Sequence, residues 1–108
     1  MGHVVAFKPH SGPWTPWERS VLAEVQRAFA QHGRMTDCQH GLSDSNTPWA
    51  AFYTANRGSF VAHVARYRRS YVLTWPDRTS MRVEEMDKLV EAVHGSATQH
   101  AWAMSGTD

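Results

Sequence analysis

The hydrophobic and polar residues follow two different periods along this chain. Between residues 16 and 32, apolar positions recur every three or four residues, which is the period of one face of an α-helix. Between residues 49 and 75 they alternate or form short blocks that turn residues interrupt, as in β-strands. The helical period returns between residues 81 and 94. The pattern predicts an α+β domain with the order helix, three-stranded antiparallel sheet, helix, and with both helices on one face of the sheet.

The first helix has clear signals at both ends. Thr15 is a good N-cap residue, Pro16 suits the first helical position, and Glu18 completes a capping box with Thr15. Gly33 is placed to end the helix. We expect Glu18 on the polar side of this helix, with Arg19. The expected apolar face consists of Trp17, Val21, Leu22, Val25, Ala28 and Phe29.

Two turns divide residues 49–75 into three strands. A four-residue turn at 55–58 and a two-residue turn at Arg68 and Arg69 set the register of the strands. The expected pairs are Tyr53 with Phe60, Ala51 with Ala62, Trp49 with Val64, Arg66 with Tyr71, and Val64 with Leu73.

Alternation along these strands assigns each side chain to one of two faces. The larger and more aromatic face is expected to pack against the helices; it holds Trp49, Ala51, Tyr53, Phe60, Ala62, Val64, Arg66, Tyr71, Leu73 and Trp75. The second face holds Ala50, Phe52, Val61, His63, Ala65, Tyr67, Val72 and Thr74. Because this second face is also largely apolar, we expect a partner, a second copy or a terminal segment to cover it.

The flanking segments are less regular. Residues 1–14 form an N-terminal segment, in which residues 3–7 are either an additional edge strand or a loose terminus. A brief strand at residues 35–38 and a loop up to Pro48 follow the first helix. The second helix is expected to follow the turn at 77–80 and to end at Gly95. The α+β domain therefore spans residues 15–95, and residues 96–108 form a tail.

Composition narrows the classes of protein. Hydrophobic residues make up 42% and charged residues 19% of the 108 residues, as in one globular domain. A single cysteine excludes an intramolecular disulfide, and no apolar run approaches the about 20 residues that span a bilayer. We therefore expect a cytoplasmic protein that does not bind membranes.

A short pattern resembles a group of small uncharacterised alphaproteobacterial proteins. The residues that carry the resemblance are Gly41-Leu-Ser-Asp44, Pro48-Trp49, Phe52 and His63-Val-Ala-Arg66, within residues 41–73. The resemblance implies a β-hairpin and no particular chemistry. The predicted order of elements also resembles the double-stranded RNA-binding domain, but the chain has an acidic segment, residues 80–85, where that family has a lysine-rich helix start.

Charge is unevenly distributed, although the net charge is only +1. Residues 49–83 contain six arginines and one acidic residue, whereas residues 84–108 contain five acidic residues and one lysine. Three arginines and two tyrosines surround the second turn. Arginine and tyrosine can bind a protein surface, or phosphates and unpaired bases. The candidate binding residues are Arg66, Tyr67, Arg68 and Arg69 at the turn, and Phe52, Val61, His63 and Val72 on the second face.

Motifs for catalysis or cofactors are weak. Cys38 and His40 could pair in a small hydrolase, but no known cysteine motif surrounds them. Asp44 and Asn46 lack the spacing of a calcium loop, and no phosphate-binding glycine motif occurs. We therefore expect no catalytic residues, no metal and no cofactor. The sequence favours an adaptor-like or regulatory domain that binds a protein or itself, with nucleic-acid binding by residues 66–71 as the alternative.

Overall fold

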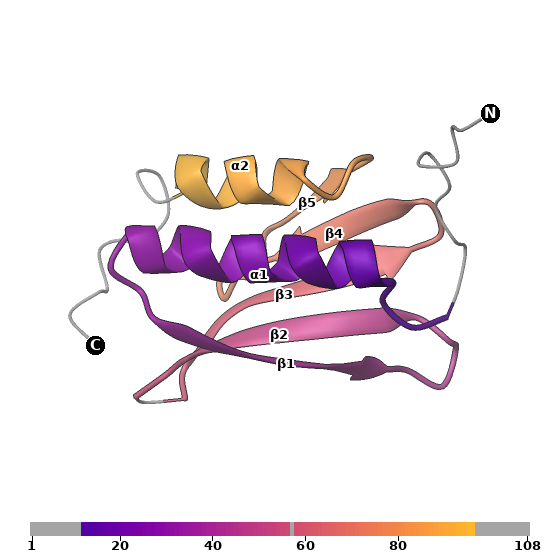
Figure 1. The fold of residues 1–108 in the computed structure, drawn as a ribbon, viewed down its shortest axis with the longest axis horizontal. Helices are drawn as coiled ribbons and strands as arrows, with labels where there is room; N and C mark the ends of the chain where they lie inside the picture. Colours follow the sequence, from indigo (N-terminus) through magenta and orange to yellow (C-terminus); the bar gives the residue numbers. More distant parts are fainter. Residues whose placement is uncertain (1–11, 57, 97–108) are drawn as a thin grey trace.

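The structure is a computed structural model that describes residues 12–56 and 58–96. These residues form a five-stranded antiparallel sheet with two helices packed on one of its faces (Figure 1). Each strand pairs with its neighbours in the sequence, so that the sheet is a meander with the order β1-β2-β3-β4-β5. The elements are α1 (Pro16–Gln31), β1 (Thr36–Leu42), β2 (Pro48–Thr54), β3 (Phe60–Tyr67), β4 (Ser70–Thr74), β5 (Ser80–Val83) and α2 (Lys88–Ser96).

The α+β class is confirmed, but the prediction of three strands is wrong because β1 and β5 complete the sheet at its two edges. β1 is longer than the brief strand expected at residues 35–38, and β5 occupies the expected start of the second helix. In the turn before β5, the Asp77 carboxylate accepts hydrogen bonds from the N–H and hydroxyl of Thr79, at 3.0 and 2.6 Å. This Asx-type turn reverses the chain into a hairpin. The expected edge strand at residues 3–7 and the tail lie outside the described residues, except that Ser96 ends α2.

The first helix has the ends that its sequence predicts. Thr15 Oγ1 accepts a hydrogen bond from the Glu18 N–H at 3.1 Å, and Glu18 Oε1 accepts one from the Thr15 N–H at 2.9 Å, which completes the capping box. After the helix, Gly33 adopts a φ of +81°, a conformation that glycine tolerates best.

Two adjacent residues of α1 have the opposite burial from that predicted. Trp17 is 54% exposed, whereas Glu18 is 1% exposed. Glu18 precedes the buried Val21, Leu22 and Val25 by three, four and seven residues, so it lies on the same face of the helix.

The predicted register holds for β3 and β4 but not along the whole of β2. Arg66 pairs with Tyr71, and Val64 pairs with Leu73, as expected. Tyr53 also pairs with Phe60, but the neighbouring Phe52 then pairs with Ala62. One residue of β3 is therefore bypassed, which is a β-bulge.

Because of the bulge, the side chains of β2 lie on the opposite faces of the sheet from those predicted. Ala50 and Phe52 enter the core beneath the helices, with both side chains fully buried. Trp49, Ala51 and Tyr53 lie on the face away from the helices, where Ala50 and Phe52 were expected. The expected pairs of Ala51 with Ala62 and Trp49 with Val64 are accordingly wrong.

A buried ion pair joins α1 to β3. The Arg66 guanidinium donates from Nε to Glu18 Oε2 at 3.0 Å and from Nη2 to Glu18 Oε1 at 2.7 Å. The Tyr71 hydroxyl, from β4, donates to Glu18 Oε2 at 2.6 Å. Burial alone would raise the pKa of Glu18, but hydrogen bonds from Arg66, the Thr15 N–H and Tyr71 outweigh it and hold this pKa below its ordinary value.

The same guanidinium holds residues 12–14 against the sheet. Arg66 donates to the carbonyl oxygens of Gly12 and Pro13 at 3.2 and 3.0 Å. The Trp14 ring lies 5.7 Å from the guanidinium carbon, within cation–π range, and its Nε1 donates to the Trp49 carbonyl oxygen at 3.0 Å. Residues 12–14, assigned from the sequence to the N-terminal segment, thus pack on the domain.

Removing one member of the buried pair should destabilise the fold strongly. We expect Arg66→Met to lower the free energy of unfolding by about 3–5 kcal/mol, because it leaves the Glu18 carboxylate buried without its cation. The double variant Glu18→Gln/Arg66→Met should recover part of this loss. Urea denaturation measures both changes.

The exposed pair of Lys88 with Glu91, at 3.3 Å, provides the control. Lys88→Met should change stability by less than about 1 kcal/mol, because water screens this pair. A loss in Arg66→Met no larger than that in Lys88→Met would contradict the role assigned to the buried pair.

Stability should also fall in acid in a way that depends on Glu18. Because its folded pKa lies below the ordinary 4.5, the carboxylate stabilises the fold fully above pH 4.5 and loses this contribution as the pH falls through the folded pKa. Denaturation midpoints measured from pH 7 to pH 3 should therefore decline less steeply for Glu18→Gln than for the wild type. Equal slopes would show that other carboxylates govern the acid sensitivity.

Candidate functional site

The candidate site is the open face of the sheet, the side away from both helices. No helix in the described ranges lies over it (Figure 1). Its aromatic side chains are half-buried or exposed, and small or β-branched residues lie between them. The residues assigned to this face by pairing are Asp37, Gln39, Gly41, Trp49, Ala51, Tyr53, Phe60, His63, Ala65, Tyr67, Val72, Thr74 and Arg82.

Trp49 and His63 stack against each other on this face. Their rings stack with an interplanar angle of 13° and centroids 6.3 Å apart. The indole also covers Gly41 on β1, where an added Cβ would lie 2.9 Å from the ring, so that the close approach requires glycine. Burial lowers the pKa of His63 below its ordinary value, which keeps the imidazole neutral near pH 7 and suited to stacking.

A second aromatic pair lies at the other end of β2. The rings of Tyr53 and Phe60 meet edge to face with centroids 6.1 Å apart, and Phe60 remains 38% exposed. Along β2, Ala51 separates Trp49 from Tyr53 and lies opposite His63, while Ala65 on β3 lies opposite Trp49. The two aromatic pairs and the small residues beside them thus form one continuous apolar strip on the open face.

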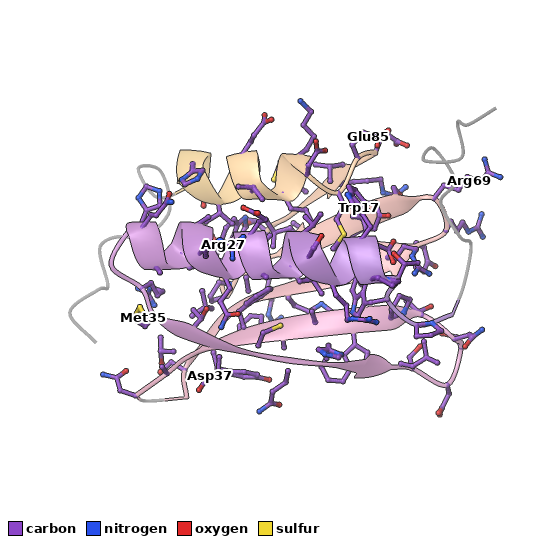
Figure 2. All side chains as sticks on the ribbon, in the orientation of Figure 1. Trp17, Arg27, Met35, Asp37, Arg69 and Glu85 are labelled. Carbon is purple, nitrogen blue, oxygen red and sulfur yellow. The ribbon has the colours of Figure 1, made fainter. Side chains whose placement is uncertain are left out.

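Charged and polar residues surround this strip. Asp37 projects from β1 on the side away from the helices, and Arg69 projects from the β3–β4 turn (Figure 2). Arg82 reaches the same face from β5, where it pairs with Val72 on β4. An apolar centre with a polar rim is typical of protein–protein interfaces.

Five of the predicted binding residues lie at the surface. His63 and Val72 are half-buried on the open face, and Tyr67 is 51% exposed at the end of β3. Arg68 and Arg69 form the expected two-residue turn between Tyr67 and Ser70. Arg68 has a φ of +62°, a conformation that costs a residue with a side chain about 1–2 kcal/mol.

Three predicted binding residues lie inside the domain instead. Phe52 and Val61 are fully buried in the core because the bulge brings them to the helix face. Arg66 is 1% exposed because its guanidinium is held by Glu18 and by backbone carbonyls. The basic turn therefore presents two guanidinium groups rather than three.

The open face also includes aromatic residues that sequence reasoning had placed against the helices, namely Trp49, Tyr53 and Phe60. Alternation could not identify them, because both faces of β2 are apolar. One usable signal was Gly41, a glycine within a strand, which often marks a close approach by another group.

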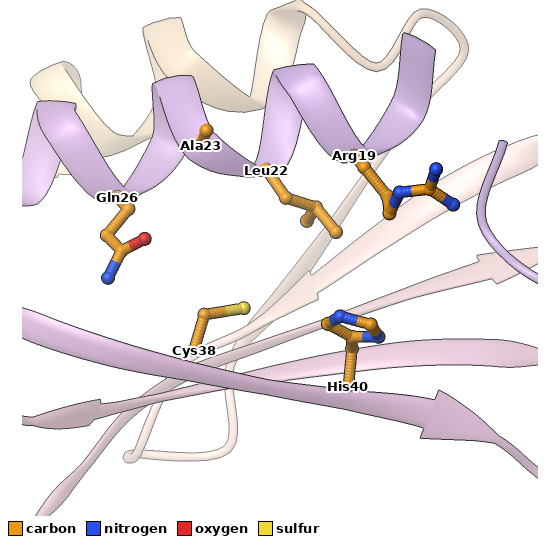
Figure 3. A pocket seen from close by; sticks show the side chains of 6 residues that line it. All are labelled: Arg19, Leu22, Ala23, Gln26, Cys38 and His40. Carbon is orange, nitrogen blue, oxygen red and sulfur yellow. The ribbon is translucent and has the colours of Figure 1, made fainter. Parts of the chain in front are cut away.

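A separate pocket lies between α1 and β1. Its volume is about 230 Å³. Cys38 and His40 project into it from β1, facing Arg19, Leu22 and Gln26 of α1 (Figure 3). Burial raises the pKa of the Cys38 thiol to about 11, so the thiolate required for nucleophilic attack is scarce at neutral pH. This geometry gives little support to the hydrolase alternative.

Comparison with known proteins supplies no assignment: no family model, curated protein or solved structure matches this chain. Within residues 12–56 and 58–96, no cluster of three or more histidine, cysteine, aspartate or glutamate side chains could hold a metal ion. No helix in the same ranges is long and apolar enough to cross a membrane.

The raised pKa of Cys38 predicts slow thiol chemistry in the folded protein. Relative to an ordinary value of 9.0, a pKa of about 11 lowers the thiolate fraction at pH 8 about a hundredfold. The alkylation rate with iodoacetamide should therefore rise steeply when urea unfolds the chain. An equal rate in the folded and unfolded protein would contradict this description and would reopen the hydrolase alternative.

Proposed function

We propose that this chain is a small non-enzymatic interaction domain that binds a protein partner, or a second copy of itself, through the open face of the sheet. The observation that supports the proposal is the apolar strip that the Trp49–His63 stack, Ala51 and the Tyr53–Phe60 pair form on this face. Aromatic residues that are already ordered before binding lose little conformational entropy when a partner covers them. An adaptor-like or regulatory role in the cytoplasm follows from the same proposal.

The shape of the surface favours a protein over a small molecule. The strip extends over neighbouring strands on one face of a sheet, whereas small-molecule sites are usually concave. Tryptophan and tyrosine are also the residues that most often dominate the binding energy of protein interfaces. Asp37 and Arg82 lie on the first and last strands, and their opposite charges could fix the orientation of the partner.

Nucleic-acid binding remains the second candidate because Tyr67, Arg68 and Arg69 are exposed together at one turn. Two guanidinium groups provide few phosphate contacts, since Arg66 is committed to Glu18 inside the domain. The aromatic strip could stack on unpaired bases. In the described part of the chain, however, few cationic side chains lie beside the strip to contact phosphates. These observations favour the protein partner.

A matched pair of tryptophan variants tests which face binds. Trp49 lies on the open face, and Trp17 is 54% exposed on α1 in the helix layer. We expect Trp49→Ala to reduce binding to the native partner at least about tenfold, or to abolish self-association, whereas Trp17→Ala should leave both unchanged. Quantitative pull-down from the native host and light scattering measure the two effects, and circular dichroism confirms folding.

A second variant keeps the test decisive if Trp49→Ala is unstable. Val72→Lys places a charge on the strip beside Arg82 and should weaken binding in the same way. The proposal fails if Trp17→Ala removes the partner while Trp49→Ala and Val72→Lys retain it. Salt-sensitive binding of a fluorescent oligonucleotide that Arg68→Ser/Arg69→Ser abolishes would instead establish the nucleic-acid alternative.

A further inference from the structure

The carboxyl ends of the two helices lie side by side at one end of the helix layer (Figure 1). The helices run in the same direction, and α1 ends at Gln31 while α2 ends at Ser96. Each helix end carries a partial negative charge of about half an elementary charge. No lysine or arginine occurs in the last turn of either helix. Two like poles therefore meet here, and a cation placed between them would be stabilised.

Two histidines occupy this junction. His32 caps the end of α1, and His94 lies in the last turn of α2, 62 residues later. His32 Nε2 is 2.9 Å from His94 Nδ1, and the ring planes make an angle of 64°. Both side chains are exposed, so a hydrated ion can reach the two nitrogens.

The separation of the two nitrogens suits a single metal ion. Imidazole nitrogens bind zinc at about 2.0–2.1 Å, which places two ligands about 2.9 Å apart at a right angle and about 3.3 Å apart in a tetrahedron. The observed 2.9 Å falls at the lower end of this range. Binding would also require each ring to rotate so that both lone pairs point at the ion, which the exposure of the two side chains permits.

We propose that His32 Nε2 and His94 Nδ1 form a binding site for a divalent transition-metal ion of the zinc, nickel and copper class. Imidazole is a preferred ligand for these ions, and charge complementarity with the helix ends adds to the affinity. Within the described ranges, no third histidine, cysteine or acidic ligand joins the pair. The bound ion links the two helices at the ends that repel each other.

The proton that joins the two rings moves when the metal binds. In the neutral pair one nitrogen donates a hydrogen bond to the other. Coordination needs a lone pair on both nitrogens, so the proton moves to the other nitrogen of its own ring. The change of tautomer balances the protons and replaces a hydrogen bond with two metal–nitrogen bonds. Glu91, one turn before His94, is hydrogen-bonded to Lys88 at 3.3 Å and is not needed as a ligand.

The experiment uses the untagged full chain and the chloride of Zn²⁺. Calorimetric titration should find one site per chain, with a dissociation constant in the micromolar range. His32→Gln and His94→Gln should each weaken binding about a hundredfold. Each variant leaves one histidine and removes the high effective concentration of the second ligand. His40→Gln removes another exposed histidine, on β1, and should leave the affinity unchanged.

Two further readouts separate this site from the other histidines of the chain. Bound metal should raise the melting temperature of the wild type and of His40→Gln, but not of the two site variants, because binding stabilises only the folded state. The nitrogen-15 shifts of the His32 and His94 rings should change together as the metal is added. Binding only above millimolar concentration, or binding that survives both site variants, would overturn the proposal.

Discussion

The bond between Glu18 and Arg66 is the constraint on which the rest of the domain depends. It joins the first turn of α1 to β3. Glu18 also accepts a hydrogen bond from the Tyr71 hydroxyl of β4, and Arg66 donates to the backbone of residues 12 and 13. A buried charge is costly unless every hydrogen-bonding group around it is satisfied, so these groups can be arranged in few ways. The pair thereby fixes how α1 lies on the sheet. It also withdraws one guanidinium from the basic turn, which leaves the open face as the more prominent surface.

Much of the fold could be read from local signals. The capping box at Thr15, the apolar face of α1 from Val21 to Phe29 and the turn at Arg68 are short-range features, and each appears as expected. The two edge strands could not be read in this way. β1 is mostly polar because one side of it faces solvent, and β5 is a four-residue strand that follows the Asp77 turn.

The candidate site was harder to predict than the fold because one extra residue in β3 decides its composition. Both faces of β2 carry apolar side chains, so alternation shows which residues lie together but not which set faces the helices. The bulge exchanges Phe52 for Trp49 and Tyr53 on the open face. Glu18 illustrates a second limit. Its spacing placed it on the buried face, but a glutamate is expected inside only when its partner is known, and that partner lies 48 residues away.

The meander has a consequence for how the chain reaches its native state. Every strand pair joins segments that are adjacent in the sequence, so the sheet can assemble hairpin by hairpin with short loops to close. The packing of α1 against α2 and the bond from Glu18 to Arg66 instead join residues that lie far apart in the sequence, so the chain loses more entropy when they form. The interaction that defines the finished domain is thus expected to form late in folding. Its main kinetic effect would then be to slow unfolding rather than to speed assembly.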